Sequence, residues 1–191
     1  MRYNKRVFIH YRRISQVKIK AREIAFAGIT GALYAAVTMA IAPIAYGPIQ
    51  LRFTEAFCVL PFFLPVTAWG LFVGCAIANI VSAAGIIDVI FGSLATLIAA
   101  LLTARIGKPF RKGAENSFTY LRCLFACAMP VALNTPIVGA ILAYTYTPEA
   151  FFAGFALFMG EVALGESIVM FTLGLVFIRL LPRTGIMKMV S

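Results

Sequence analysis

Apolar residues fill long runs of this chain, and short polar segments separate the runs. Between Phe53 and Ala104, a stretch of 52 residues carries two charged side chains, Glu55 and Asp88. A soluble domain does not leave so much apolar sequence without charge, whereas the core of a lipid bilayer penalises charge and accommodates Leu, Ile, Val, Phe and Ala. The stretch is too long for one crossing, so it must fold back on itself inside the membrane.

The breaks between the apolar runs predict an all-α, polytopic membrane protein with six membrane-spanning helices in one bundle. The boundaries follow from the need for about 20 apolar residues per crossing and from the Pro and Gly residues that end a run. The second segment is short, so it must cross where the membrane is thin or where protein shields it. The predicted spans are residues 24–45, 53–65, 68–84, 88–105, 118–143 and 151–180.

Composition supports a membrane protein and adds an orientation. The 191 residues are 62% hydrophobic and 13% charged, with a mean hydropathy of +0.94. The net charge is +10, and eight of the seventeen basic residues lie in residues 1–22. The hydrophobic bulk makes the positive-inside rule a better account of this charge than nucleic-acid binding.

Six crossings place both termini on the same side of the membrane as the basic loop 105–117. The turns on the other side carry one basic residue, Arg52. The sequence therefore predicts a multi-pass protein of the cell membrane with both termini in the cytoplasm. Residues 1–22 form a basic extension, residues 23–181 the six-helix domain, and residues 182–191 a tail. The extension fits a weak amphipathic helix or a disordered segment equally well.

Polar residues within the spans are the candidates for a binding site, because an ionisable residue there costs about 2.5–3.5 kcal/mol on insertion scales and usually faces a cavity or a partner. In the predicted topology most of them lie in the outer half of the membrane or at its midplane. They predict a polar pocket that opens to the outside and contacts a ligand through Arg52, Glu55, Asn79, Asp88, Asn134 and Glu161.

Structural alternatives exist for several of these residues. Arg52 and Glu55 have the spacing of a local ion pair at a helix start, and we expect Arg52 to orient Glu55. Asp88 has the position of an N-cap on the fourth span. Glu161 and Glu166 lie about 140° apart on an ideal helix, so one can face a ligand while the other faces a neighbouring helix.

Asn134 lies between Pro130 and Pro136, which free backbone carbonyls within the fifth span. The sequence predicts a kink there, and a kink suits a binding site or a structural bend equally.

Small residues recur every four positions on two of the spans, and such stripes allow close helix approach. On the third span the stripe includes Gly70 and Gly74, and we expect it to pack inside the bundle. On the first span it includes Gly28, Ala32 and Ala36, which can pack in the bundle or receive a partner subunit.

Motifs for catalysis are missing from the sequence. Gly107 and Lys108 are followed by Pro109, so they complete no phosphate-binding loop, and HExxH and GxSxG motifs do not occur. The four cysteines form no CxxC pair, and their neighbours do not suggest a metal site. The sequence therefore predicts no enzyme, no metal and no cofactor, and it favours a protein that binds or transports a solute.

The segment around the second span resembles a known family. Arg52, Thr54 and Glu55, followed by Leu60 and Pro61, resemble the R-x-[ST]-E-x-x-x-x-L-P signature of the QueT family. The similarity continues through residues 70–79 and 88–97 and, more loosely, to residue 181. Members of this family are substrate-binding S components of energy-coupling-factor transporters, assigned to queuosine precursors.

The resemblance implies a six-helix S-component fold and a 7-deazaguanine substrate, such as its aminomethyl form or queuine. It also implies three partners, namely a transmembrane coupling subunit that contacts Gly28, Ala32 and Ala36, and two ATPases. A carboxylate suits this substrate because a guanine-like edge offers adjacent N–H donors. Alternatives are an S component for thiamine or riboflavin, a self-sufficient proton-coupled transporter, and a small intramembrane enzyme or scaffold.

Overall fold

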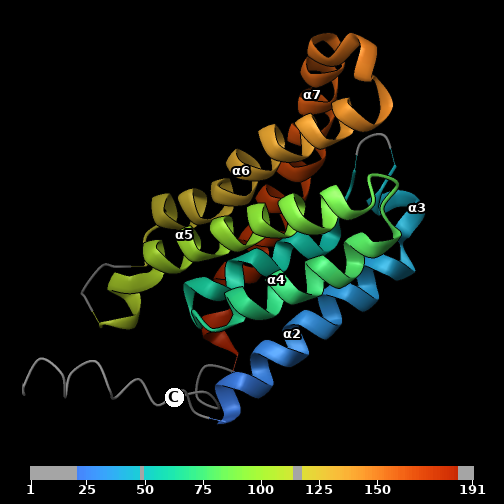
Figure 1. Ribbon diagram of the computed structural model, residues 1–191. Helices are drawn as coiled ribbons and strands as arrows, with labels where there is room; N and C mark the ends of the chain where they lie inside the picture. Colours follow the sequence, from blue (N-terminus) through green and yellow to red (C-terminus); the bar gives the residue numbers. More distant parts are fainter. Residues whose placement is uncertain (1–20, 48–49, 114–117, 185–191) are drawn as a thin grey trace, which may run out of the picture.

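The computed structural model describes residues 21–47, 50–113 and 118–184, and the regular structure of this part is entirely helical (Figure 1). Most of the predicted N-terminal extension and of the predicted tail lies outside the described residues. Two described helices are apolar but shorter than a usual crossing, Phe53–Phe62 and Thr67–Val81. Within the described ranges, four helical segments are long and apolar enough to cross a membrane: Ala21–Ala40, Asp88–Arg111, Tyr120–Tyr146 and Pro148–Arg183.

The first half of the fold is built from short pieces. Helix α2 (Ala21–Ala40) is followed by the single turn α3 (Ala42–Ala45), which has a proline in its first turn, where the missing N–H has no helical partner to lose. The 3₁₀-helix η1 spans Phe53–Phe62. Helix α4 (Thr67–Ala78) ends in the 3₁₀ turn η2 (Asn79–Val81).

The second half consists of longer helices. The π-helical turn η3 (Asp88–Gly92) leads directly into α5 (Ser93–Arg111), and α6 runs from Tyr120 to Tyr146 without a break in spite of its two prolines. The last segment is continuous from Pro148 to Arg183. Its parts are η4 (Pro148–Ala150), α7 (Phe151–Val169), the π-helical turn η5 (Met170–Gly174), α8 (Leu175–Leu180) and η6 (Leu181–Arg183).

Helix η1 lies in the middle of the bundle, where it contacts α2, α4, α5, α6 and α7. Seven of its ten residues are buried, including Val59 and Phe62. A 3₁₀-helix rises about 2.0 Å per residue, so ten residues reach about 20 Å, compared with about 15 Å in an α-helix. The short second segment is therefore largely shielded by protein, which is one of the two situations that its length predicted.

Glycines allow α2 and α4 to touch backbone to backbone. A Cβ atom on Gly70 would overlap the carbonyl oxygen of Ala27, and one on Gly74 would overlap that of Gly31. The small-residue stripe of the third predicted span thus packs inside the bundle, as predicted. Gly28, Ala32 and Ala36 lie on the other side of α2, where they are exposed and where nothing lies within 4 Å of a Cβ built on Gly28.

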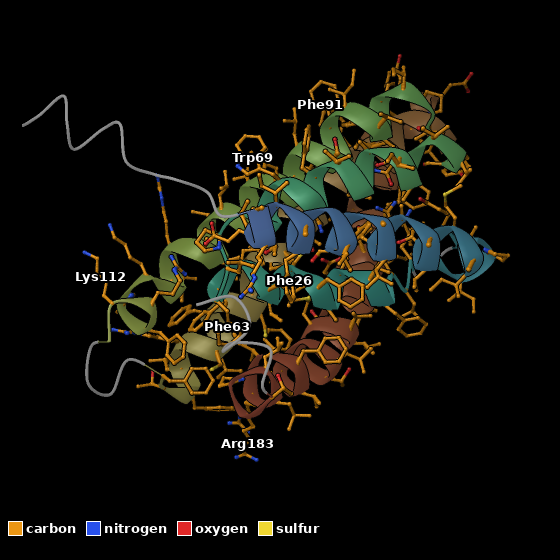
Figure 2. The ribbon with its side chains drawn as sticks, turned by 90° about the horizontal axis from the view of Figure 1, so that it is seen from below. Phe26, Phe63, Trp69, Phe91, Lys112 and Arg183 are labelled. Atoms are coloured by element: carbon orange, nitrogen blue, oxygen red, sulfur yellow. The ribbon has the colours of Figure 1, made fainter. Side chains whose placement is uncertain are left out.

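The outer surface of the bundle is apolar. Trp69 and Phe91 point away from the ribbon in Figure 2 and are 57% and 55% exposed. Exposed large apolar side chains also occur along α2, α6 and α7. A surface of this kind is stable where the surroundings are lipid tails rather than water.

The two ends of the bundle differ in charge. The start of α2, the end of α5 and η6 lie toward one end, whereas α3 and the turn between α6 and α7 lie toward the other (Figure 1). Arg22, Lys112 and Arg183 belong to the first group, and Figure 2 shows Lys112 and Arg183 extending outward. The α6–α7 turn carries an acidic residue, Glu149.

Candidate binding site

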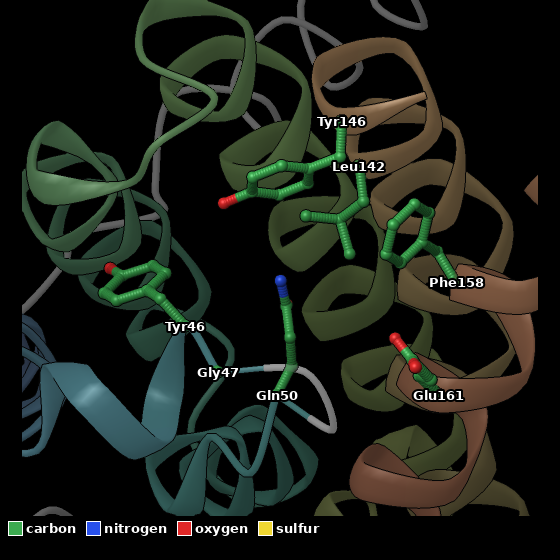
Figure 3. Close-up of a pocket in the computed structure, with 7 residues that line it drawn as sticks. All are labelled: Tyr46, Gly47, Gln50, Leu142, Tyr146, Phe158 and Glu161. Atoms are coloured by element: carbon green, nitrogen blue, oxygen red, sulfur yellow. The ribbon is translucent and has the colours of Figure 1, made fainter. Parts of the chain in front are cut away.

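A pocket of about 360 Å³ opens between the turn after α3 and the hairpin of α6 and α7. This volume lies within the range of about 300–1,000 Å³ that small-molecule sites occupy. Figure 3 shows its aromatic and aliphatic side chains surrounding a space into which two polar side chains project. The lining residues are Tyr46, Gly47, Gln50, Leu142, Tyr146, Phe158 and Glu161.

Glu161 is the predicted site residue that lines this pocket. It lies on α7, and its Oε2 atom is buried without a hydrogen-bond partner among the described residues. A buried carboxylate oxygen without a donor is costly, so this oxygen is free to accept a hydrogen bond from a molecule in the pocket. Glu166, five residues later, faces α6 instead, which is the position that their angular separation allowed for one of the two acids.

Arg52 and Asp88 form a buried ion pair behind the pocket wall. Arg52 Nη2 and Asp88 Oδ2 lie 3.3 Å apart, and the two side chains are 6% and 3% exposed. The expectation that Arg52 orients Glu55 is therefore wrong, because its carboxylate partner is Asp88, 36 residues away in the sequence. The helix-cap alternative for Asp88 is also wrong, since the residue begins the π-helical turn η3 and caps no helix end.

Tyr46 connects this ion pair to the pocket. The guanidinium carbon of Arg52 lies 4.8 Å from the centre of the Tyr46 ring, and the ring also lines the pocket. The Tyr46 hydroxyl donates to the carbonyl oxygen of Ala78 at 2.6 Å. Burial raises the pKa of Tyr46 to about 12, so the hydroxyl remains a neutral donor and holds the ring in place.

Asn79 strengthens the same cluster from the first position of η2. Its Nδ2 donates to the backbone carbonyl of Asp88 at 2.9 Å. Gly92 leaves the room for this contact, because a Cβ at that position would overlap Asp88 Oδ1 and crowd Asn79 Nδ2. The π-helical turn at residues 88–92 thus brings a carboxylate and an amide together deep in the bundle, and such turns are frequent at functional sites.

Glu55 lies deeper and is 1% exposed. Both of its oxygens have donors within the chain, since Oε1 accepts from the Tyr34 hydroxyl and Oε2 accepts from Cys58 Sγ at 3.1 Å. The contact with Tyr34 joins η1 to α2, whereas the contact with Cys58 lies within η1. Glu55 was predicted to contact a ligand, but it does not line the pocket.

Asn134 meets Glu166 between α6 and α7, where its Nδ2 donates to Glu166 Oε1 at 2.9 Å. Asn134 is 4% exposed and, like Glu55, does not line the pocket. Its position between two prolines has not broken α6.

Gln50, which precedes the recognised motif by two residues, stands among the polar residues near the spans in the sequence but was not predicted to contact a ligand; the structure places it in the pocket. The sequence did not single out Tyr146 and Phe158, because aromatic residues are too frequent in the chain. The ring centres of Tyr146 and Phe158 lie 6.0 Å apart. Across the described ranges, no group of three or more His, Cys, Asp and Glu side chains is placed to hold a metal ion.

The bundle has apolar helices long enough to cross a bilayer and an apolar outer surface, which define a polytopic membrane protein. It also has a largely apolar pocket of small-molecule size. The family model described as "QueT transporter" matches residues 24–183, and the chain belongs to this family. The queuosine precursor transporter QueT of Lactococcus lactis subsp. cremoris (strain MG1363) is 30% identical over 158 residues, covering 78% of this chain and 86% of that protein. No solved structure matches the chain.

Proposed function

We propose that this chain is the substrate-binding S component of an energy-coupling-factor importer and captures a queuosine precursor from outside the cell. Membership of the QueT family and the name of the Lactococcus relative support the substrate class. The observation that carries the proposal is the unpartnered carboxylate oxygen of Glu161 in an otherwise largely apolar pocket. A 7-deazaguanine, such as its aminomethyl form or queuine, supplies adjacent N–H donors for this oxygen and a flat ring for the aromatic walls.

The membrane arrangement that we propose has six crossings, with η1 and the α4–η2 segment completing the four longer helices. Both termini then face the cytoplasm, and the basic residues near the ends of α2, α5 and η6 follow the positive-inside rule. The pocket opens on the opposite side, where substrate arrives. Residues 1–22 and 182–191 are cytoplasmic extensions of a single domain.

The proposed partners are a transmembrane coupling subunit and two ATPases, so the chain itself is no enzyme. The exposure of Gly28, Ala32 and Ala36 on α2 supports a contact with the coupling subunit, because small side chains let another helix approach closely. Among the six predicted substrate contacts, Glu161 lines the pocket, which supports a direct contact with the ligand. Arg52, Asn79 and Asp88 support the Tyr46 wall, and ligand contact by these three, Glu55 and Asn134 stays a prediction.

Binding and uptake measurements test the proposal separately. The purified protein should bind the aminomethyl 7-deazaguanine without ATP, and uptake into vesicles should require the coupling subunit and the ATPases. Competition by thiamine or riboflavin, but not by deazaguanine, would indicate a different vitamin. Transport by this chain alone under a pH gradient would instead indicate a proton-coupled transporter.

The Glu161→Gln variant tests the site. We expect roughly ten- to hundredfold weaker binding, because a charge-assisted hydrogen bond is lost. Glu149→Gln is the matched control, since Glu149 is exposed on the α6–α7 turn and should leave affinity unchanged. Wild-type affinity of the Glu161→Gln variant would remove Glu161 from the site.

A further inference from the structure

Gln50 is a pocket residue with an unusual backbone conformation. Its φ angle is 47°, and it is the one residue other than glycine with a positive φ in the part of the chain that the structure describes. This left-handed region is uncommon for a residue with a Cβ, and such positions cluster at ligand-binding sites. Gln50 is also 6% exposed, so its polar side chain is turned into the protein.

The backbone of Gln50 is held on both sides. Its N–H donates to the carbonyl oxygen of Gly47 at 3.0 Å, and its own carbonyl accepts from the N–H of Arg52 at 2.9 Å. Arg52 is fixed in turn by the ion pair with Asp88 and by the Tyr46 ring. The buried ion pair therefore positions the turn that carries Gln50.

The side-chain amide of Gln50 is available to a ligand. Figure 3 shows it projecting into the pocket between Tyr46 and Leu142. Among the hydrogen bonds that connect the described residues, those of Gln50 are made by its backbone. An amide carries two donors as well as an acceptor, so it complements a ligand differently from a carboxylate, which only accepts.

The pocket thus offers two distinct polar groups within apolar walls. Gln50 comes from the turn after α3, and Glu161 comes from α7 with an unpartnered oxygen. Leu142, Phe158 and the Tyr46 ring supply the apolar surface. A planar heterocycle between these walls presents one edge to Gln50 and Glu161. The order of hydrogen-bond donors and acceptors along that edge decides how well the heterocycle binds.

We propose that Gln50 is a specificity-determining residue that recognises the ring carbonyl of a lactam-type heterocycle. The Gln50 amide donates to this carbonyl, and Glu161 accepts the neighbouring ring N–H and the exocyclic amino group. The inference rests on the proposed function, because it assumes that a deazaguanine occupies this pocket. A 6-amino heterocycle presents a bare ring nitrogen to the Glu161 carboxylate, which has no proton to donate. It also presents an amino group to the Gln50 amide, which must turn over to accept from it, so this heterocycle binds more weakly.

Binding of 7-deazaguanine and 2,6-diamino-7-deazapurine to the purified full chain tests the assignment. The wild type should prefer 7-deazaguanine by roughly a hundredfold or more. Gln50→Gly suits the left-handed backbone and should keep the thermal unfolding midpoint, yet lower 7-deazaguanine affinity about tenfold. Ala83→Gly, on an exposed turn, is the control and should change neither quantity.

A double variant, Gln50→Glu with Glu161→Gln, exchanges the two groups without changing the charge of the pocket. It should reverse the preference, because the new carboxylate accepts from the 6-amino group and the new amide donates to the ring nitrogen. Wild-type affinity in Gln50→Gly, or an unchanged preference in the double variant, would overturn the role of Gln50 alone. Failure of the wild type to bind 7-deazaguanine and its aminomethyl form would overturn the proposed function, and this inference with it.

Discussion

Glu55 illustrates how this protein stabilises a carboxylate inside an apolar bundle. Its two oxygens accept hydrogen bonds from Tyr34 and Cys58. Nearby, the hydroxyl oxygens of Thr38 on α2 and Thr54 on η1 lie 2.6 Å apart and form a second hydrogen bond between these elements. A carboxylate in such surroundings is tolerated when each of its oxygens has a donor. The motif acid Glu55 is therefore part of the connection between η1 and α2, independently of any contact with ligand.

Removal of the Tyr34 hydroxyl should destabilise the fold. In Tyr34→Phe, Oε1 of Glu55 loses its donor, and we expect the free energy of unfolding to fall by about 1–3 kcal/mol. Thermal unfolding of the purified protein in detergent measures this change. Tyr144→Phe is the control, because Tyr144 is 61% exposed on α6. Equal unfolding midpoints for Tyr34→Phe and the wild type would show that the hydroxyl contributes nothing.

Helix α2 has two faces with different tasks. The face with Ala27 and Gly31 touches the backbone of α4, whereas the face with Gly28, Ala32 and Ala36 is exposed. Both faces consist of small residues, so spacing alone cannot distinguish the internal contact from one available to a partner. The distinction depends on which side of α2 the next helix covers.

The internal contact should not tolerate even a methyl group. Gly70→Ala places a Cβ against the carbonyl of Ala27, and overpacking of this kind costs typically about 1–3 kcal/mol. We expect a lower thermal unfolding midpoint and a smaller folded fraction in size-exclusion chromatography. Gly28→Ala provides the comparison, since a Cβ there meets no atom within 4 Å. Similar behaviour of the two variants would contradict the close α2–α4 contact.

The part of the molecule that the structure describes is polarised along its length. Basic residues collect where α2 begins and where α5 and η6 end, and the pocket lies toward the end formed by α3 and the α6–α7 turn. By the positive-inside rule, the proposed orientation has the basic end in the cytoplasm. In that orientation the pocket faces the side from which an imported solute would arrive.

Cysteine labelling of intact cells tests this orientation. A membrane-impermeant maleimide should label the Glu149→Cys variant and should label Lys112→Cys only after the cells are opened. The four native cysteines are buried and free, so they contribute little background. Labelling of Lys112→Cys in intact cells would reverse the proposed topology.

Hydropathy and turn residues were sufficient to find the helical segments. The fifth predicted span, 118–143, corresponds to α6 at Tyr120–Tyr146, and the sixth, 151–180, lies within Pro148–Arg183. The ends differ by a few residues because polar residues can extend a helix beyond the apolar run. The 3₁₀ form of η1 was not predictable, since it depends on the helices that surround it.

The amino-acid sequence alone established a helical membrane protein, its family and the small set of ionisable residues that must be paired or face a cavity, because lipid tolerates no other use of them. The tertiary structure decided which partner each of these residues has. Arg52 meets Asp88 rather than Glu55, Glu166 meets Asn134, and Glu161 faces the pocket with Gln50. These partners are far apart in the chain, so only the packing of helices against one another brings them together.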